Sequence, residues 1–247
     1  MKLMGIINLT PDSFYSPSRY NYSMLDREDI DIVDVGAVST RPGAEPVGIE
    51  EEWERLRPFL QMWKDRFGFG TTCGKWLDSR ELWPAHISSP KELSIDTTSS
   101  EIVRRAFELV GPFFVNDISA GHDDAQMLPT VGRLGLPYIA MHKRGTPKTM
   151  DSLVDTETDI IAQLHDYFRA FEADAAAAGI DRWVLDPGLG FAKTAAQNIE
   201  ILQRLGELEV FGRPILIGVA DKRFTEGNTA YYEKMGARNG AHILRIH

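Results

Sequence analysis

The sequence has only one cysteine, Cys73, so no disulfide can form within the chain. This cysteine usage does not require an oxidising compartment, and we expect a cytoplasmic location. The sequence also lacks an apolar stretch long enough to span a membrane. Its apolar opening, residues 1–9, breaks at Thr10, Pro11 and Asp12 and is too short for a secretory signal.

Positive charge is scarce, because 27 Lys and Arg residues face 36 Asp and Glu residues and give a net charge of −9. An acidic surface repels phosphate backbones and anionic lipid heads, which argues against a nucleic-acid or membrane partner. Anionic substrates must therefore meet a locally positive site. The 43% hydrophobic and 26% charged composition favours one soluble globular domain.

Short apolar runs recur along the chain and predict strands of a parallel sheet, because their apolar character is nearly continuous. These eight runs are 2–9, 31–36, 93–97, 113–119, 138–142, 183–187, 214–220 and 242–247. Helical periodicity lies between most of them, at 49–67, 99–110, 123–134, 155–178 and 195–208. This alternation predicts an α/β fold, a (β/α)₈ TIM barrel formed by residues 1–247 as a single domain.

Three features depart from an ideal barrel. Residues 23–29 supply barely two turns for the first helix, and the sequence stops on the last predicted strand, so no eighth helix follows. Residues 68–89 form an insertion, which we expect to be a self-packed loop on the far side of the barrel. We hypothesise that the chain is a condensed version of a longer one, shortened within 14–31 and 222–240.

Polar residues fall at or just past the carboxyl ends of the predicted strands. They are Asn8, Asp34, Asp96, Asn116, His142, Asp186, Lys222, Arg245 and His247. Any one of them alone could simply bond its own loop. Barrel enzymes assemble their active sites at this end, so the recurrence predicts that these side chains converge on one mouth.

Seven motif segments coincide with these strand ends: 8–14, 34–44, 94–97, 116–119, 141–147, 186–193 and 245–247. In this order they resemble dihydropteroate synthase, a pterin-binding enzyme family, from residue 4 to residue 247 with gaps. The resemblance implies a transferase of folate biosynthesis. Such an enzyme condenses 6-hydroxymethyl-7,8-dihydropterin pyrophosphate with p-aminobenzoate to give 7,8-dihydropteroate and pyrophosphate. It also implies Mg²⁺ and a homodimer.

The resemblance assigns roles to individual residues. The catalytic group would be Asp34, Asp96, Asp186, Lys222 and Arg245. The pterin pocket would comprise Asp96, Asn116, Ile118, Met141, Asp186, Phe191, Lys222 and Arg245. Pyrophosphate would bind Asn8, Thr40, Arg41, Arg245 and His247, with Asn8 also contacting the metal. The p-aminobenzoate pocket would comprise Phe14, Thr40, Arg41, Pro42, Phe191 and Lys222.

The chemistry of these residue types agrees with those roles. A pterin presents a fork of N–H donors beside a carbonyl, which a carboxylate accepts and an amide or ammonium complements. A guanidinium stacks on a ring face and still reaches an anion. Mg²⁺ takes few protein ligands and completes its shell with phosphate oxygens and water. By contrast, His142 and Lys143 are expected to be structural, and Lys193 to flank its loop.

The match to the family breaks after the seventh predicted strand. The family shows Gly-Val-Ser-Arg-Lys where this chain has Gly-Val-Ala-Asp-Lys at 218–222. The family's serine helps to hold the p-aminobenzoate carboxylate, so Ala220 would cost roughly 1.5 to 3 kcal/mol of binding. Two alternatives stay open: a non-catalytic pterin-binding paralogue, and a folate-dependent methyltransferase, which the loop at 39–43 and the terminal Arg-x-His disfavour.

Overall fold

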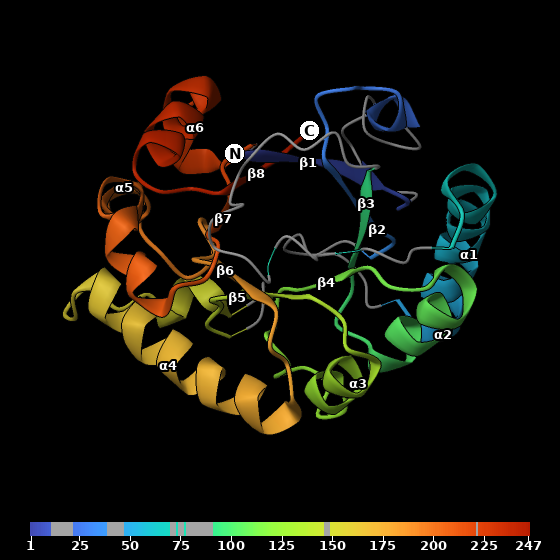
Figure 1. Ribbon diagram of the computed structural model, residues 1–247. Helices are drawn as coiled ribbons and strands as arrows, with labels where there is room; N and C mark the ends of the chain where they lie inside the picture. Colours follow the sequence, from blue (N-terminus) through green and yellow to red (C-terminus); the bar gives the residue numbers. More distant parts are fainter. Residues whose placement is uncertain are drawn as a thin grey trace.

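The structure, a computed structural model, describes residues 1–10, 22–38, 47–69, 73, 77, 91–145, 149–220 and 222–247. Eight parallel strands form a ring that Figure 1 views along its axis. They are β1 (Lys2–Asn8), β2 (Ile32–Gly36), β3 (Glu92–Asp96), β4 (Phe114–Asp117), β5 (Tyr138–Met141), β6 (Trp183–Asp186), β7 (Leu216–Gly218) and β8 (Ile243–Ile246).

The ladder of hydrogen-bonded strands runs in the order β6-β5-β4-β3-β2-β1-β8-β7. A single parallel bridge from Leu185 to Ile215, with a 2.9 Å bond from Leu185 N to Pro214 O, links the two ends. The sheet is therefore nearly closed, and the prediction of a (β/α)₈ barrel is confirmed.

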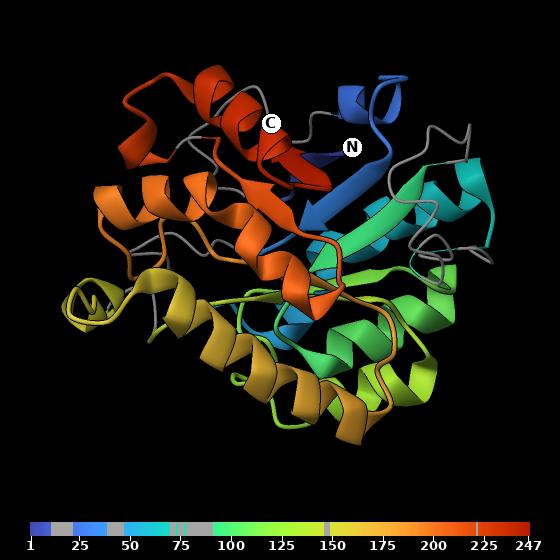
Figure 2. The same ribbon diagram turned by 60° about the vertical axis from the view of Figure 1, so that its left-hand side comes forward.

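Helices cover the outside of the ring, as Figure 2 shows from a second direction. They are α1 (Ile49–Phe67), α2 (Ser100–Val110), α3 (Met127–Leu134), α4 (Ile160–Ala178), α5 (Ala195–Gln203) and α6 (Thr229–Arg238), with short 3₁₀ turns η1 (Tyr22–Leu25), η4 (Met150–Leu153), η5 (Leu205–Phe211) and η6 (Arg223–Thr225). Local chemistry sets several ends: Thr194 and Gln197 form a capping box, and Gly179 ends α4 in the left-handed conformation. None of the described helices is long and apolar enough to cross a bilayer.

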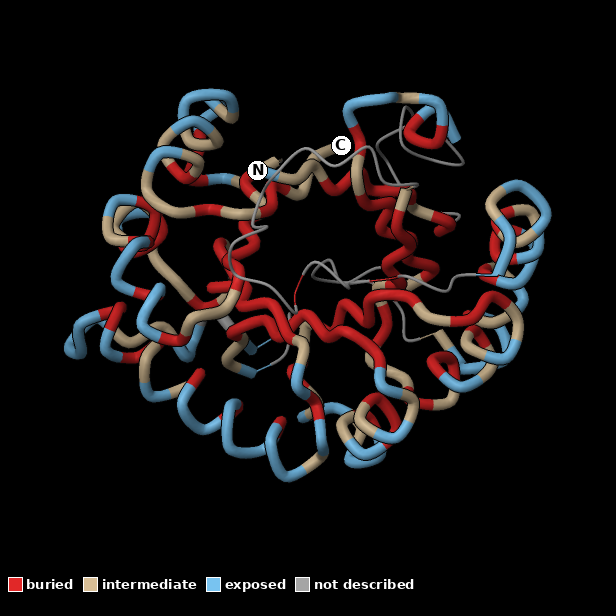
Figure 3. Tube along the Cα trace, viewed as in Figure 1, coloured by how far each residue is buried: buried red, intermediate tan, exposed pale blue. Residues whose placement is uncertain are grey.

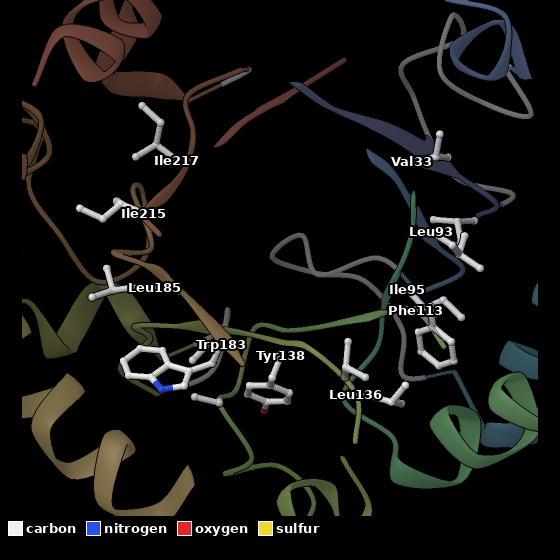
Figure 4. Close-up of a cluster of buried hydrophobic side chains, with 14 of the residues drawn as sticks. Val33, Leu93, Ile95, Phe113, Leu136, Tyr138, Trp183, Leu185, Ile215 and Ile217 are labelled. Carbon is white, nitrogen blue, oxygen red and sulfur yellow. The ribbon is translucent and has the colours of Figure 1, made fainter. Parts of the chain in front are cut away.

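Side chains alternate between the two faces of each strand and build two apolar clusters. Figure 3 shows the ring of strands as buried, and the outward faces of the helices as exposed. The larger cluster lies between strands and helices, where Figure 4 labels Val33, Ile95, Tyr138, Trp183 and Ile217 among others. A smaller cluster fills the barrel interior and contains Met4, Ile32, Cys73, Leu77, Phe114, Ile139, Val184, Leu216 and Ile243.

The predicted departures from an ideal barrel are partly borne out. In the described part of the β1–β2 connection the helical element is η1, a four-residue 3₁₀ turn, as the short first helix required. The ten-residue helix α6 had no counterpart among the predicted helices. Strand β8 ends one residue before the last residue of the sequence.

Two residues of the insertion correct the expectation of a self-packed surface loop. Cys73 and Leu77 are each 8% exposed and belong to the interior cluster. Arg182 donates to the Cys73 carbonyl oxygen at 3.1 Å, which ties this position to the chain just before β6. These residues therefore help to close the barrel at the amino-terminal ends of its strands.

Replacement of Phe114 by alanine tests the interior cluster. Phe114 is fully buried within the ring, so Phe114→Ala should lower the free energy of unfolding by about 3 to 5 kcal/mol in chemical denaturation. Phe69, 52% exposed, is the matched control, and Phe69→Ala should change stability by no more than about 0.5 kcal/mol. Equal effects of the two substitutions would contradict this description of the core.

Candidate active site

Strand register brings the predicted polar residues to one end of the barrel. Gly36 pairs with Asp96, and Asp96 pairs with Asn116, so the carboxyl ends of β2, β3 and β4 lie at one level. Met141 on β5 pairs with Asp186 on β6. On each strand these residues alternate with outward-facing apolar ones, and this parity directs them toward the barrel axis.

Asp34 is the hub of this end. Its carboxylate, fully buried, accepts a 2.7 Å bond from Ser94 Oγ on Oδ1. Its Oδ2 accepts from Asn116 Nδ2 at 3.1 Å and from Arg245 Nε at 2.7 Å. Residues on β2, β3, β4 and β8 are thereby held by a single charged group.

Arg245 bridges Asp34 to the neighbouring acid Asp96, whose Oδ2 it reaches with Nη2 at 2.9 Å. Burial raises the pKa of Asp96 from its ordinary value of 3.8 to about 7. Arg245 opposes this rise, while the nearby acids Asp34, Asp117 and Glu52 add to it. Asp96 is consequently an acid that titrates near neutral pH at the base of the mouth.

The loop after β6 supplies a second group of candidates. Asp186 accepts a 2.8 Å bond from the Gly188 backbone N–H. Burial raises the pKa of Asp186, and the Gly188 N–H, Lys222 and Arg245 act against the rise. The Lys222 ammonium lies 4.6 Å from the centre of the Phe191 ring, a cation–π distance. Two predicted residues from different loops are thus in contact.

The remaining predicted residues fall into two groups. Asn8 ends β1, Ile118 lies partly buried in the turn after β4, Met141 is buried on β5, and His247 follows β8. The other group lies outside the described residues: Phe14, Thr40, Arg41, Pro42 and Asp221. Their roles stay predictions.

Ser94 belongs to the motif at 94–97, but the sequence predicted no role for it. Its hydroxyl donates to Asp34 across two strands, 60 positions apart in the chain. The missed signal is parity, because Ser94 stands two residues before Asp96 on the same strand and so shares its inward face. Asp117 faces the other way and accepts bonds from Tyr138 Oη at 2.6 Å and Ser119 Oγ at 2.7 Å, outside the mouth.

His142 lies at this end but is turned toward its neighbours. Its Nδ1 is 2.8 Å from Lys193 Nζ, and its ring meets Tyr167 edge-on at 4.7 Å. Burial, with Lys193 and Arg144 nearby, holds its pKa well below the ordinary value, so the ring is neutral. A separate hollow of about 370 Å³ lies beyond it, lined also by Arg144, Tyr167 and Asp155.

The family model described as pterin binding enzyme matches residues 4–71 and 85–247. The chain belongs to the pterin-binding enzyme family. The expected resemblance to dihydropteroate synthase is confirmed by the relatives of this pterin-binding chain. It is 33% identical to the dihydropteroate synthase of Escherichia coli, covering 99% of this chain and 86% of the relative. It is 35% identical to that of Synechocystis, covering 90% and 72%.

Other relatives are longer. The chain is 39% identical to a folic acid synthesis protein of Pneumocystis carinii over 90% of its own length, but it spans only 29% of that protein. The alignment with the Escherichia coli enzyme runs over 267 positions, more than the 247 residues of this chain. That relative therefore has segments which this pterin-binding chain lacks.

Solved structures of dihydropteroate synthases share the fold. The enzyme of Clostridium difficile, in the presence of pteroic acid, aligns with a TM-score of 0.80 at 29% identity, covering all of this chain and 90% of that one. The enzyme of Thermus thermophilus, in complex with 4-aminobenzoate, aligns at 0.78 and 30% identity, covering all of this chain and 88% of that one.

The raised pKa of Asp96 predicts a pH effect. One aspartate carboxyl should titrate near pH 7 by carbon NMR, and its signal should be missing in Asp96→Asn. Since the folded pKa lies above the unfolded value near 4, this group stabilises the fold fully below about pH 4. That contribution disappears as the pH rises through about 7, and the loss should be absent from Asp96→Asn. The assignment would be refuted if the signal lost in Asp96→Asn titrated near pH 4 in the folded wild type.

Proposed function

We propose that this chain is a dihydropteroate synthase that condenses 6-hydroxymethyl-7,8-dihydropterin pyrophosphate with p-aminobenzoate. The products are 7,8-dihydropteroate and pyrophosphate. The observation that carries the proposal is the network of Asp34, Asp96, Asn116 and Arg245 at the mouth of a barrel in this family. Two carboxylates, an amide and a guanidinium at one mouth suit the binding of a bicyclic ring with N–H donors, and this supports the proposal.

The pterin pocket follows from these groups. Asp96 and Asp186 accept from the ring N–H fork, while Asn116 and Lys222 meet its acceptors. Arg245 lies on the ring face. The apolar walls are Ile118, Met141 and Phe191. Two observations support this assignment. The Asp96 side chain is only partly buried, and the Lys222 ammonium lies against the Phe191 ring.

The reaction breaks the C–O bond at the pterin methylene, and pyrophosphate leaves with the electron pair. The aryl amine then forms the new C–N bond and releases its proton. Asp34, Asp96 and Asp186 stabilise the positive charge that spreads into the ring, and Lys222 and Arg245 complete the catalytic group. Arg245 and His247 hold the departing pyrophosphate, together with Thr40 and Arg41 from the second loop.

Magnesium belongs to this proposal through Asn8. Among the residues that the structure describes, no three His, Cys, Asp or Glu side chains cluster to hold a metal. A single amide oxygen at the end of β1 fits an ion that takes most of its ligands from a diphosphate and water. When bound there, Mg²⁺ would neutralise diphosphate charge and ease its departure.

The p-aminobenzoate pocket is assigned by resemblance to Phe14, Thr40, Arg41 and Pro42, with Phe191 and Lys222 as its described members. Ala220 follows β7 and leaves this pocket without the hydroxyl that the family uses. Asp221 adds negative charge in the sequence where the family has an arginine.

Assembly and location are part of the same proposal. A homodimer is expected from the family. We place the enzyme in the cytoplasm, in keeping with its single cysteine. The chain forms one domain, 1–247, with the insertion at 68–89, and the family match is interrupted at 72–84 within it.

The two alternatives are not favoured. The relatives of Escherichia coli and Synechocystis carry the name dihydropteroate synthase, and none of the relatives described above is a methyltransferase. A non-catalytic paralogue would keep the pterin grip and lose turnover, and Ala220 with Asp221 is the feature that suggests it. Enzyme assays separate it from the synthase.

The decisive assay measures pyrophosphate release from the pterin pyrophosphate with Mg²⁺, with and without p-aminobenzoate. A synthase should release pyrophosphate in step with dihydropteroate formation, and fastest when the amine is present. Arg245→Lys should slow turnover strongly, because lysine cannot bridge Asp34 and Asp96 and still lie on the ring. If the chain bound the pterin without any turnover, it would be the non-catalytic paralogue and not a synthase.

Restoring the missing hydroxyl tests the amine site. Ala220→Ser should lower the KM for p-aminobenzoate by about one to two powers of ten, the worth of one hydrogen bond to a charged group. The KM for the pterin substrate should stay unchanged. A gain shared by both substrates, or no gain at all, would remove Ala220 from the amine pocket.

A further inference from the structure

Lys193 makes three contacts that the proposed reaction does not use. Its ammonium nitrogen lies 2.9 Å from the Gly188 carbonyl oxygen, 3.0 Å from the Phe191 carbonyl oxygen and 2.8 Å from His142 Nδ1. An ammonium has three N–H donors, so the three acceptors match its capacity. Because His142 is neutral, its Nδ1 can offer a lone pair to Lys193.

The loop that Lys193 holds has an unusual backbone. Gly188, Gly190 and Ala192 have φ angles of 64°, 82° and 48°, which places three of five consecutive residues in the left-handed region. Such a path is costly for Ala192, which carries a side chain, and it persists only where surrounding contacts fix it. A Cβ on Gly188 would collide with the His142 carbonyl oxygen, so the loop also lies tightly against the end of β5.

Two other bonds also fix this loop. The His142 N–H donates to the Asp186 carbonyl oxygen at 2.8 Å, and the Gly190 N–H donates to Asn198 Oδ1 at 2.7 Å. Lys193 joins Gly188 and Phe191 to His142, the residue that follows β5. The loop carries Asp186 at its start and Phe191 near its end, the two members that the pterin pocket takes from this segment.

We infer that Lys193 is a positioning residue for pterin recognition, which fixes the Asp186 carboxylate and the Phe191 ring in their binding geometry by clamping the loop between them. The inference rests on the proposed function. Preorganisation of this kind raises affinity because the ligand does not have to order the loop. Lys193 touches backbone carbonyls and an imidazole, so it acts through its neighbours.

The charges around Lys193 are consistent with this role. Burial, aided by Lys222 and Arg144, lowers its pKa to about 7, and Asp186 opposes the fall. In return, Lys193 lowers the pKa of Asp186. The clamp therefore has its three donors, and its charge acts on the Asp186 carboxylate, when Lys193 is protonated, which is favoured below about pH 7.

Lys193→Met tests the clamp, since methionine keeps the volume and removes the donors. Lys91→Met is the matched control: Lys91 also donates to two backbone carbonyls, at Arg27 and Ile30, but it precedes β3 at the opposite end of the barrel. Calorimetry would follow 6-hydroxymethyl-7,8-dihydropterin and inorganic pyrophosphate separately. We expect Lys193→Met to weaken pterin binding by about tenfold and to leave pyrophosphate binding unchanged. Lys91→Met should lower Tm without changing either affinity.

The outcomes separate the clamp from the proposed function. A wild-type chain that does not bind the pterin defeats the proposed function itself. A wild-type chain that binds it, with Lys193→Met binding equally well, overturns only the clamp. So does an equal loss of pyrophosphate affinity, because that would indicate general damage to the mouth.

A second pair of variants covers the case in which Lys193→Met does not fold. His142→Leu removes the acceptor for Lys193, whereas His142→Asn keeps a polar atom near the Nδ1 position. The inference expects His142→Leu to weaken pterin binding more than His142→Asn. Equal affinities in these two variants would count against the clamp.

Discussion

The buried carboxylate of Asp34 is the constraint on which this barrel depends. An ionised carboxylate taken out of water costs several kcal/mol unless it is paired and fully hydrogen-bonded. Ser94, Asn116 and Arg245 supply those bonds from three other strands. The requirement to satisfy one charge therefore decides which residue types can stand on β3, β4 and β8 at this level. The same donors and acceptors face the proposed ligand, so the polar layer serves stability and recognition together.

The interior of the barrel is divided by this layer. On its amino-terminal side, Met4, Phe114, Ile139 and their neighbours form an apolar cluster. On the side of the polar layer where the strands have their carboxyl ends, the segments at and after the ends of β6 and β7 carry Asp186, Phe191 and Lys222. The apolar half holds the strands in register, and register determines which side chains reach the mouth. Function at one end thus depends on packing at the other.

Much of the fold could be predicted from the sequence, because the periodicity of apolar residues and the positions of polar residues at strand ends are local properties of the chain. The apolar steps of 49–67 predicted α1 with both ends correct, and eight apolar runs predicted the eight strands within three residues at each end. Helix α6 was missed because only Gly236 among its residues is described as buried, so it carries little apolar periodicity. The roles of Ser94 and Lys193 were missed for another reason: their partners Asp34 and His142 are 60 and 51 positions away. Such pairs depend on strand register, which no local pattern contains.

The charge balance at the mouth explains why the proposed substrate needs more than the described residues offer. Arg245 bonds to both Asp34 and Asp96, and Lys222 and Lys193 lower the pKa of Asp186, so these cations already interact with acids before any ligand arrives. A diphosphate adds charges that these cations, already engaged by acids, cannot fully neutralise. The net charge of −9 worsens the deficit at long range. Arg41, which lies outside the described residues, and Mg²⁺ at Asn8 are the positive groups that the proposal adds. The balance therefore predicts that the described barrel residues suffice for pterin recognition, whereas pyrophosphate recognition also needs Arg41 and Mg²⁺.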